Sequence, residues 1–404
     1  MRASRSSGFE IFATTSPGLE SIAAGELKSL GIRGRQEPGG VAFSGDMDRI
    51  YGSNLWLRTA SRVIVRLGQF HASTFFELER RAKRLPWERF LAATGDVRLR
   101  VTCRKSKLYH SDAVGERVLA AISASASRDL GVRAETPDDD AIEDGSGIGV
   151  AERGKPSQLF IVRIVHDECE ISADTSGELL HRRGYRQEIA KAPLRETIAA
   201  AMVLASGWTG DSPLLDPMCG SGTIPIEAAM VALKIAPGAK RGFQFMHWPD
   251  FNERRWNEIL AEAEAMAAPT ARPLEIAGSD RDAGAIQAAT RNAERAGVSE
   301  VVSFGVDAVS GSVRAIKDSG KGRGWVLTNP PYGVRVGAAG DLRNLYAALA
   351  APFTNAPGWR LGVLTSDSGL VHNSGLKMKA RFSTSNGGIP VGFFVSEKEE
   401  ADVR

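Results

Sequence analysis

From about residue 193 onward, the chain repeats one pattern: a short, almost continuously apolar run, then a segment with helical periodicity. Such runs are typical of parallel strands that helices cover on both faces, so the pattern predicts a doubly wound α/β sheet. In such a sheet, ligands bind beyond the carboxyl ends of the strands, and the polar residues that end them become site candidates. We place the strands at PLLD (213–216), LEIAGSD (274–280), VVSFGVD (301–307), WVLTNP (325–330) and RLGVLTS (360–366), with an antiparallel edge hairpin formed by 376–384 and 388–397.

The first half of the chain has no such alternation. Residues 9–92 mix short apolar runs with helical periods, including a helix at 18–31, and predict a small α+β unit. A second unit follows, with strands at 96–107 and 158–174 and a helix at 111–131. The polar stretch 135–157, rich in Gly and Asp, is expected to be an exposed loop.

Composition narrows the class of protein. With 404 residues, 43% of them apolar and 25% charged, the chain has the composition of a multidomain globular protein. The three cysteines (Cys103, Cys169, Cys219) are too few and too far apart for a disulfide framework, and the six histidines form no metal pair, so we expect no metal. No run has the length of a signal peptide core or a membrane helix, so a cytoplasmic protein without a membrane partner is expected.

A glycine-rich turn, LLDPMCGSGT (214–223), leads from an apolar strand into an Ala-rich helix. Glycines at such a turn let backbone amides approach a ligand at a helix N-terminus, although a purely structural turn would look similar. Asp280 ends a later strand, where a carboxylate can accept both hydrogen bonds of a ribose diol. It lies 60 residues after Gly220, so this interpretation requires the insertion that residues 234–273 provide.

The run Asn329-Pro330-Pro331-Tyr332 is the most specific feature of the chain. Two prolines at a strand end remove two donors, which leaves the Asn329 side-chain oxygen and the Pro330 carbonyl as acceptors for an exocyclic amine. Tyr332 offers a ring on which an extruded base can stack. A plain proline turn is the alternative. The order of the glycine loop, Asp280 and Asp307 along the chain favours the chemical interpretation.

With these motifs, and with LHRRGYR (180–186) and APLRETIAAAMV (192–203), residues 9–400 resemble the bacterial THUMP-domain RNA methyltransferases that make N2-methylguanine in 23S ribosomal RNA. The resemblance implies a ferredoxin-like domain at 1–65, a THUMP RNA-binding domain at 66–177 and a class I methyltransferase domain at 178–404. It implies methyl transfer at Asn329, Pro330, Pro331 and Tyr332. It also implies S-adenosylmethionine as the cofactor, bound by Asp216, Pro217, Cys219, Gly220, Ser221, Gly222, Thr223, Asp280 and Asp307.

The residues point to an RNA surface independently of the resemblance. The net charge of the chain is only +3. Between residues 80 and 107, however, there are ten basic side chains and only two acidic ones, which gives this segment a local charge of +8. Arg98, Arg100 and Arg104 share one face of the strand there, and Lys105 and Lys107 follow, so these five are candidates for phosphate contacts. A solvated charged face is the alternative. Arg182, Arg183 and Arg186 join the two halves and could either grip RNA or brace the domains.

Taken together, these features predict an S-adenosylmethionine-dependent RNA guanine-N2 methyltransferase acting on RNA, with 23S ribosomal RNA as the expected partner. Two alternatives stay open at this point. One is an adenine-N6 methyltransferase acting on DNA or RNA, because the NPPY run serves both amines. The other is a non-catalytic RNA-binding assembly factor for the ribosome.

Overall fold

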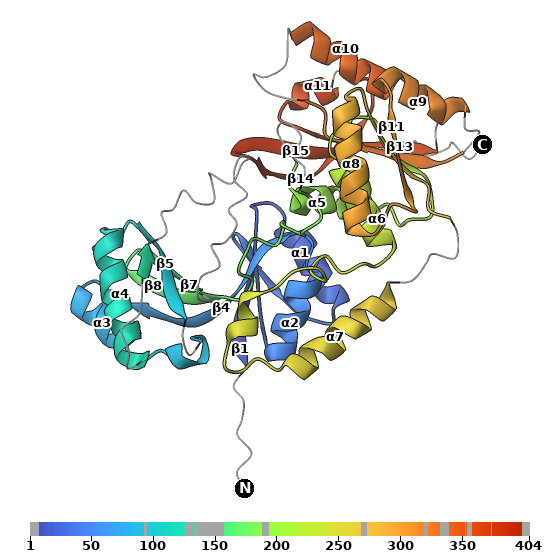
Figure 1. The fold of residues 1–404 in the computed structure, drawn as a ribbon. Helices are drawn as coiled ribbons and strands as arrows, with labels where there is room; N and C mark the ends of the chain where they lie inside the picture. Colours follow the sequence, from blue (N-terminus) through green and yellow to red (C-terminus); the bar gives the residue numbers. More distant parts are fainter. Residues whose placement is uncertain are drawn as a thin grey trace.

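The chain folds around two β-sheets, which a computed structural model places in two lobes (Figure 1). The structure describes residues 8–92, 95–126, 132–134, 157–187, 194–267, 273–318, 322–331, 339–351, 353, 358–372 and 374–397. Most of the loop expected at 135–157 therefore lies outside the described residues, and so does Tyr332.

The first sheet has eight strands in the order β2-β3-β1-β4-β8-β7-β5-β6. All neighbours are antiparallel except β5, which runs parallel to both β7 and β6. The strands are β1 (Phe9–Thr15), β2 (Arg35–Glu37), β3 (Gly40–Gly45), β4 (Ala60–His71), β5 (Asp96–Arg104), β6 (Val132–Ala134), β7 (Ser157–Val165) and β8 (Glu168–Asp174). The helices of this lobe are α1 (Glu20–Ser29), α2 (Met47–Trp56), α3 (Phe75–Ala82) and α4 (Ser111–Ala126), with a 3-10 turn at Trp87–Arg89.

Strand β4 belongs to both α+β units. Its residues 60–66 pair with β1, and its residues 64–71 pair with β8, so the two units share one continuous sheet. The boundary predicted at 65/66 falls inside this strand, and the division into domains remains a prediction.

One predicted strand is wrong. The segment 158–174 folds as a hairpin, because His166 and Asp167 between β7 and β8 adopt φ values of 53° and 63°. Two consecutive residues with positive φ form the tight turn that suits the twist of paired antiparallel strands. His-Asp is a weak turn signal compared with Asn-Gly, and the apolar runs on both sides of it concealed the break.

The second sheet has seven strands in the order β11-β10-β9-β12-β13-β15-β14. The first five are parallel, and β14 and β15 form the predicted antiparallel hairpin at one edge. The strands are β9 (Leu214–Asp216), β10 (Ile276–Asp280), β11 (Val302–Val306), β12 (Gly324–Thr328), β13 (Trp359–Thr365), β14 (Met378–Asn386) and β15 (Ile389–Ser396). The order along the chain reverses between β9 and β12, which makes their carboxyl ends the topological switch point.

Helices cover both faces of this sheet, which confirms the doubly wound class. One face packs against α5 (Glu196–Ser206), α6 (Thr223–Ala232) and α8 (Ala283–Ala296). The other carries α9 (Val309–Asp318), α10 (Ala339–Ala350) and α11 (Ser368–His372).

The insertion between α6 and β10 packs away from its own sheet. Its helix α7 (Glu253–Met266) lies beside α2 of the first lobe (Figure 1). Tyr51 of α2 contacts the rings of Phe245 and Trp256 at centroid distances of 4.9 and 5.8 Å, and Trp248 meets Phe90 at 4.8 Å. The apolar core of the first lobe therefore includes side chains from the second half of the chain.

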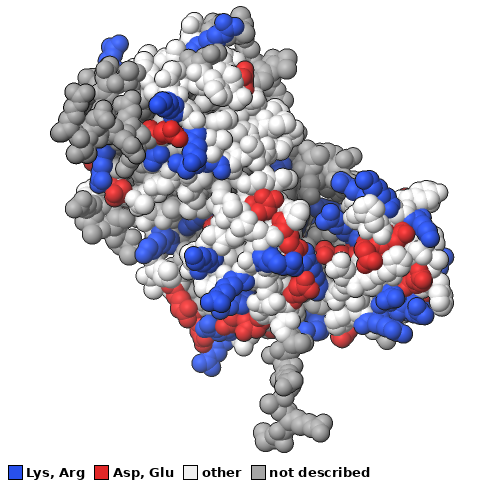
Figure 2. Space-filling model, turned by 180° about the vertical axis from the view of Figure 1, so that it is seen from behind, with Lys and Arg blue, Asp and Glu red and all other residues white. Residues whose placement is uncertain are grey.

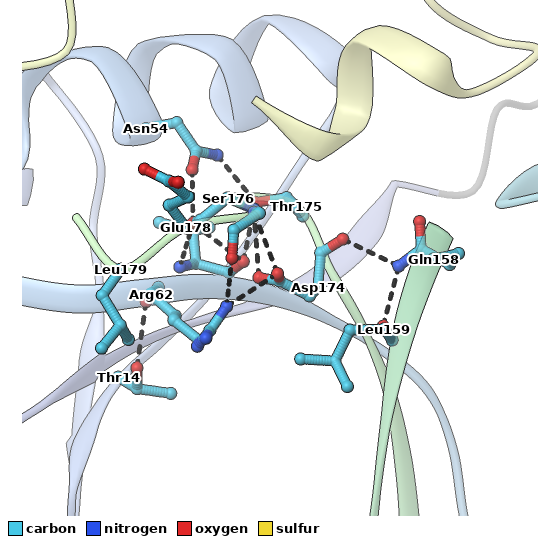
Figure 3. A network of polar contacts seen from close by, with 12 residues as sticks. Thr14, Asn54, Arg62, Gln158, Leu159, Asp174, Thr175, Ser176, Glu178 and Leu179 are labelled. Carbon is cyan, nitrogen blue, oxygen red and sulfur yellow. Dashed lines mark hydrogen bonds and ion pairs between the residues drawn. The ribbon is translucent and has the colours of Figure 1, made fainter. Parts of the chain in front are cut away.

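A buried polar network fixes the chain where it leaves β8 (Figure 3). Arg62 of β4 donates to the fully buried carboxylate of Asp174 at 2.9 Å, and the same carboxylate accepts the N–H groups of Ser176 and Gly177. Asn54 of α2 donates to the Thr175 hydroxyl at 2.7 Å. A charged pair this deeply buried tolerates little movement, so residues 174–177 leave the sheet in a fixed direction.

Candidate active site at the carboxyl ends of the parallel strands

Strand pairing brings together the carboxyl ends that the sequence singled out. Gly278 of β10 pairs with Asp216 of β9, and Val326 of β12 pairs with Leu215 of β9. Asp280 and Asn329 therefore end up on either side of the loop that follows β9. This is the switch point of the sheet, where an open α/β fold offers a crevice to a ligand.

The glycine loop lies against the end of β10. The N–H of Cys219 donates to the Ser279 carbonyl at 2.9 Å, and the N–H of Gly220 donates to Asp280 Oδ2 at 3.0 Å. Gly222 has φ 84°, and a Cβ there would lie 2.8 Å from Phe304 Cζ and 3.0 Å from Ala289 Cβ. Glycine is thus required by both the backbone conformation and the close packing.

The loop residues contribute backbone and packing rather than exposed side chains. Gly220 is partly exposed, whereas the other predicted loop residues (Pro217, Cys219, Ser221, Gly222 and Thr223) are buried. Burial raises the pKa of the Cys219 thiol, which excludes this cysteine as a nucleophile near neutral pH.

Asp216 lies beneath the loop. Its side chain is buried, and Oδ1 accepts the Met218 N–H at 3.1 Å and the Thr328 hydroxyl at 2.7 Å. Burial raises the pKa of this carboxyl to about 7. Asp216 therefore connects β9, the glycine loop and β12 from inside the protein, and in this arrangement it is a positioning residue.

Asp280 and Asp307 lie next to each other at the ends of β10 and β11. The Asp307 N–H donates to the Asp280 carbonyl at 3.1 Å, and Asp280 Oδ1 accepts the Asp282 N–H at 3.0 Å. Asp307 is exposed, and its carboxylate accepts the Ala308 N–H and the Ser312 hydroxyl. Each carboxylate is thus held by local donors at the carboxyl end of its strand.

Sequence reasoning missed Val306, which is 58% exposed beside Asp307. An exposed apolar side chain among carboxylates offers a flat aromatic ligand a surface that the acidic groups do not. In the sequence, Val306 is the apolar residue directly before Asp307. Its position did not indicate whether its side chain would be buried or exposed.

Asn329 is the most unusual polar group of the site. Its Oδ1 atom is buried, and no described group donates a hydrogen bond to it. Leaving a buried acceptor unpaired costs about 1–3 kcal/mol, so such an atom calls for an explanation, and a ligand donor is one. Pro330 is buried and Pro331 exposed, which leaves little freedom to the backbone after β12.

The five candidate RNA-binding residues of the first lobe have two kinds of surroundings. Arg98 and Arg100 are half-buried on β5, on the face opposite the buried Val97, Leu99 and Val101. Arg104, at the end of β5, and Lys105 and Lys107, which follow it, are exposed.

The linker arginines brace the protein. The Arg183 guanidinium is 1% exposed, donates to the carbonyls of Leu180 and Arg58, and pairs with Glu227 of α6 at 3.4 Å. Arg186 pairs with the buried Glu196 of α5 at 3.1 Å. Arg183 thus bonds groups of both halves, as the brace alternative expects, whereas Arg186 bonds the Leu194 carbonyl and Glu196 within the second half, and a role for either in RNA binding stays a prediction. Arg182 is half-buried beside them.

Comparison with known proteins identifies the family of the chain. A family model described as an RMKL-like methyltransferase domain matches residues 183–391, which include every described residue of the crevice. The chain belongs to the RMKL-like methyltransferase family. A second model, described as the RlmL ferredoxin-like domain, matches residues 10–64.

Relatives of the RMKL-like family align with almost the whole chain. A protein of Synechocystis sp., slr0064, named as a candidate RNA methyltransferase, is 34% identical over 94% of each chain. The ribosomal RNA large subunit methyltransferase K/L of Syntrophotalea carbinolica is 33% identical over 94% of this chain but only 52% of its own length. The chain thus spans about half the length of that K/L relative.

Solved structures with the same fold cover the chain from end to end. SMU.472, a candidate methyltransferase crystallised with SAH, superposes with a TM-score of 0.84 at 30% identity, covering 98% of this chain and 100% of its own. A protein of Listeria monocytogenes, titled as a predicted N6-adenine-specific DNA methylase, gives a TM-score of 0.84 at 34% identity, covering 97% of each chain.

The described residues form neither a membrane-spanning helix nor a cluster of metal ligands. None of the helices they form is both long and apolar enough to cross a membrane. Within the same residues, no three His, Cys, Asp or Glu side chains gather as a metal site would require.

Proposed function

We propose that this protein transfers a methyl group from S-adenosylmethionine to the exocyclic N2 amine of a guanine in 23S ribosomal RNA, in the cytoplasm. The observation that carries the proposal is the buried Oδ1 of Asn329 at the end of β12, to which no described group donates a hydrogen bond. An amine N–H would supply that donor. The resemblance of the NPPY run to guanine-N2 methyltransferases and the large-subunit name of the K/L relative support the choice of guanine and of 23S RNA.

The crevice fits the cofactor. The partly exposed Gly220 lets a ligand approach the backbone closely at the start of α6, where the amides and the helix dipole favour a carboxylate. Asp280 offers oxygens for a ribose diol, and Val306 and Asp307 offer an apolar surface and an acceptor for adenine. When bound, S-adenosylmethionine supplies a methyl group on a sulfonium that a nucleophilic nitrogen can displace in line.

The residues of the chain then act on the amine. An amino group conjugated to a purine ring is a poor nucleophile, because its lone pair is delocalised. Acceptors at Asn329 Oδ1 and the Pro330 carbonyl, each taking one N–H, favour the pyramidal nitrogen whose lone pair is free to attack. The rate then comes from positioning and polarisation of the amine, and the proton is lost to solvent after transfer. Tyr332 would stack on the extruded base.

RNA is bound, in this proposal, by the region at 66–177, which acts as a THUMP domain. Arg104, Lys105 and Lys107 are exposed there and suit phosphate contacts, with Arg98 and Arg100 beside them on β5. Lys and Arg side chains are interspersed with acidic ones over the face seen in Figure 2. Binding would thus depend on this local cluster rather than on the charge of the whole molecule.

Two observations support the alternative of an adenine-N6 methyltransferase. The Listeria relative is titled an N6-adenine-specific methylase, and the NPPY run suits both amines. The alternative of a non-catalytic assembly factor has less support, because Gly220, Asp280 and Asn329 are all in place.

The test is to identify the methylated nucleoside. Unmodified 23S ribosomal RNA is incubated with the protein and labelled S-adenosylmethionine, then digested and analysed by mass spectrometry. N2-methylguanosine at one site is expected; N6-methyladenosine would establish the alternative, and cofactor binding without any product would favour the assembly factor.

Two variants separate binding from chemistry. Asn329→Ala should lower single-turnover methyl transfer by about 100-fold while cofactor affinity stays nearly unchanged, because a preorganised acceptor is lost. Asp280→Ala should instead weaken cofactor binding by about 1.5–3 kcal/mol, measured by calorimetry. If Asn329→Ala lowered affinity and rate equally, Asn329 would belong to the cofactor site.

A further inference from the structure

Three segments of the first lobe converge on the turn between β7 and β8. The Asp167 carbonyl accepts the N–H of Ala72, at the entrance to α3. The Asp167 carboxylate accepts the N–H of Lys107 at 2.7 Å, and the Asp167 N–H donates to the Ser106 hydroxyl at 3.0 Å. The segments before α3 and before α4 are therefore joined at one end of the sheet, which we call the β7–β8 tip (residues 71–76, 104–112 and 166–168).

Two exposed aromatic rings lie at this tip. Phe76 is 72% exposed and Tyr109 is 68% exposed, the highest values among the large apolar side chains that the structure describes. Helices α3 and α4, which follow these residues, pack side by side (Figure 1), and Arg117 of α4 reaches both Phe75 and Glu79 of α3. Large apolar side chains left this exposed commonly mark a binding site when they lie near one another.

The surroundings of the rings suit further stacking. The Tyr109 ring lies 4.0 Å from the His110 ring, at an interplanar angle of 41°, and the Arg80 guanidinium lies 5.6 Å from the Phe76 centroid. A hollow of about 400 Å³, lined by residues 109–113 and Glu116, opens beside Tyr109. Rings flanked by imidazole and guanidinium groups and open to solvent are typical of platforms for unpaired bases.

The basic side chains of the tip lie in the segment directly before Tyr109 in the chain. Arg104, Lys105 and Lys107 are exposed, and Lys105 has the left-handed φ of 48°. The Ser106 hydroxyl donates to the Arg104 carbonyl at 2.8 Å, so this basic segment is held in place before any ligand arrives.

Two of the acidic side chains at the tip interact with neighbouring groups. The Asp167 carboxylate accepts the Lys107 N–H, and Glu168 pairs with His71 at 3.2 Å. Asp112 and Glu116 are exposed on the first turns of α4 and would repel a phosphate backbone from that side. The exposed Arg and Lys side chains that a polyanion can contact at the tip are those of the 104–107 segment.

We propose that the β7–β8 tip captures an unpaired segment of RNA, with bases stacked on Tyr109 and Phe76 and phosphates held by Arg104, Lys105 and Lys107. The proposal rests on RNA being the substrate, as proposed above. Base-paired RNA does not fit, because the faces of its bases are already stacked and an exposed ring cannot reach them.

The experiment measures the affinity of the full chain for a labelled single-stranded RNA oligonucleotide and for a duplex of the same sequence, across a salt series. Tyr109→Ala and Phe76→Ala should each weaken single-strand binding by about tenfold at every salt concentration, because stacking does not depend on counterions. Tyr109→Trp should keep the single-strand affinity of the wild-type protein.

The Lys105→Ala/Lys107→Ala variant should instead make the salt dependence of RNA binding shallower. Met266→Ala, which truncates another exposed apolar side chain, should change neither.

The outcomes distinguish the two proposals. If the wild-type protein methylates RNA but both aromatic variants bind the single strand as tightly as it does, the tip is not an RNA site, and its rings are left for a protein partner. If the aromatic variants lose duplex and single-strand affinity equally, the preference for unpaired RNA is wrong. If the wild-type protein binds S-adenosylmethionine but neither binds nor methylates any RNA, the proposed function itself fails.

Discussion

The buried carboxyl of Asp216 makes the stability of the folded protein depend on pH. Its pKa rises to about 7 because burial disfavours the charged form, while the Thr328 hydroxyl and the Met218 N–H partly oppose the shift. The ordinary value is 3.8, so between about pH 4 and pH 7 the folded protein binds more protons here than the unfolded chain. The contribution of Asp216 to stability is therefore most favourable below pH 4 and is lost as the pH rises through 7.

Asp216→Asn should remove this pH dependence while keeping an oxygen that accepts both hydrogen bonds. Relative to the wild-type protein, the variant should gain about 2–4 kcal/mol of unfolding free energy between pH 4 and pH 8, at about 1.4 kcal/mol per pKa unit. Urea unfolding of both proteins at pH 4, 5, 6, 7 and 8 measures the difference. Thr328→Val serves as the opposing control, because loss of the hydroxyl raises the pKa of Asp216 further. A difference between wild type and Asp216→Asn that does not change with pH would contradict the assignment.

At the scale of elements, helix α6 connects the glycine loop to the rest of the molecule. Glu227, one turn into the helix, is fully buried and accepts the Tyr185 hydroxyl at 3.0 Å in addition to its contact with Arg183. Arg58 of the first lobe donates to the carbonyls of Met230 and Ile235, at and beyond the end of the helix. Movement of α6 is thus opposed from both halves of the chain.

Arg183→Met should destabilise the protein by about 3–5 kcal/mol, because it leaves the Glu227 carboxylate buried without its charged partner. The double variant Arg183→Met/Glu227→Gln should be less destabilised than Arg183→Met alone, since the neutral amide still accepts the Tyr185 hydroxyl. Urea unfolding of the wild type, both single variants and the double variant forms the cycle. Additive losses would show that the two side chains do not interact.

The elements also show which parts of the fold the sequence could predict. Each parallel strand was predicted to within about two residues, because a strand buried on both faces is a continuous apolar run with a polar end. The position of the candidate site could be predicted from the polar residues that end these strands, because the carboxyl ends of parallel strands meet at one edge of the sheet.

What could not be predicted depends on contacts distant in sequence. The sequence LHRRGYR reads the same whether Arg183 contacts RNA or, as in the structure, Glu227, which lies 44 residues further along the chain. The same holds for the packing of Trp256 on Tyr51, which no local periodicity encodes. The hairpin at His166 was missed for a local reason, the absence of Gly or Asn at the turn.

At the scale of the whole molecule, the two lobes share their cores. Phe243, Phe245, Trp248 and Trp256 follow the glycine loop in sequence but are buried in the first lobe. In the opposite direction, Leu19 at the start of α1 is fully buried in the core of the second lobe with Ile198 and Met202 of α5. Neither lobe can therefore bury its apolar surface alone, and the first lobe is held in a fixed orientation toward the second.

We expect the full chain to unfold in one cooperative transition. Calorimetry should give a single peak, and probes of the two lobes should report the same midpoint, such as labelling of the buried Cys169 thiol for the first lobe and cofactor binding for the second. Phe245→Ala should create a large core cavity, lower the free energy of unfolding by about 3–5 kcal/mol and thereby lower the midpoint that both lobes share. A fragment of residues 193–404 should aggregate, because it exposes the four aromatic side chains that the first lobe buries. Two separate transitions, or a soluble fragment that binds S-adenosylmethionine with full affinity, would show that the lobes are thermodynamically independent and that the insertion merely rests on the first lobe.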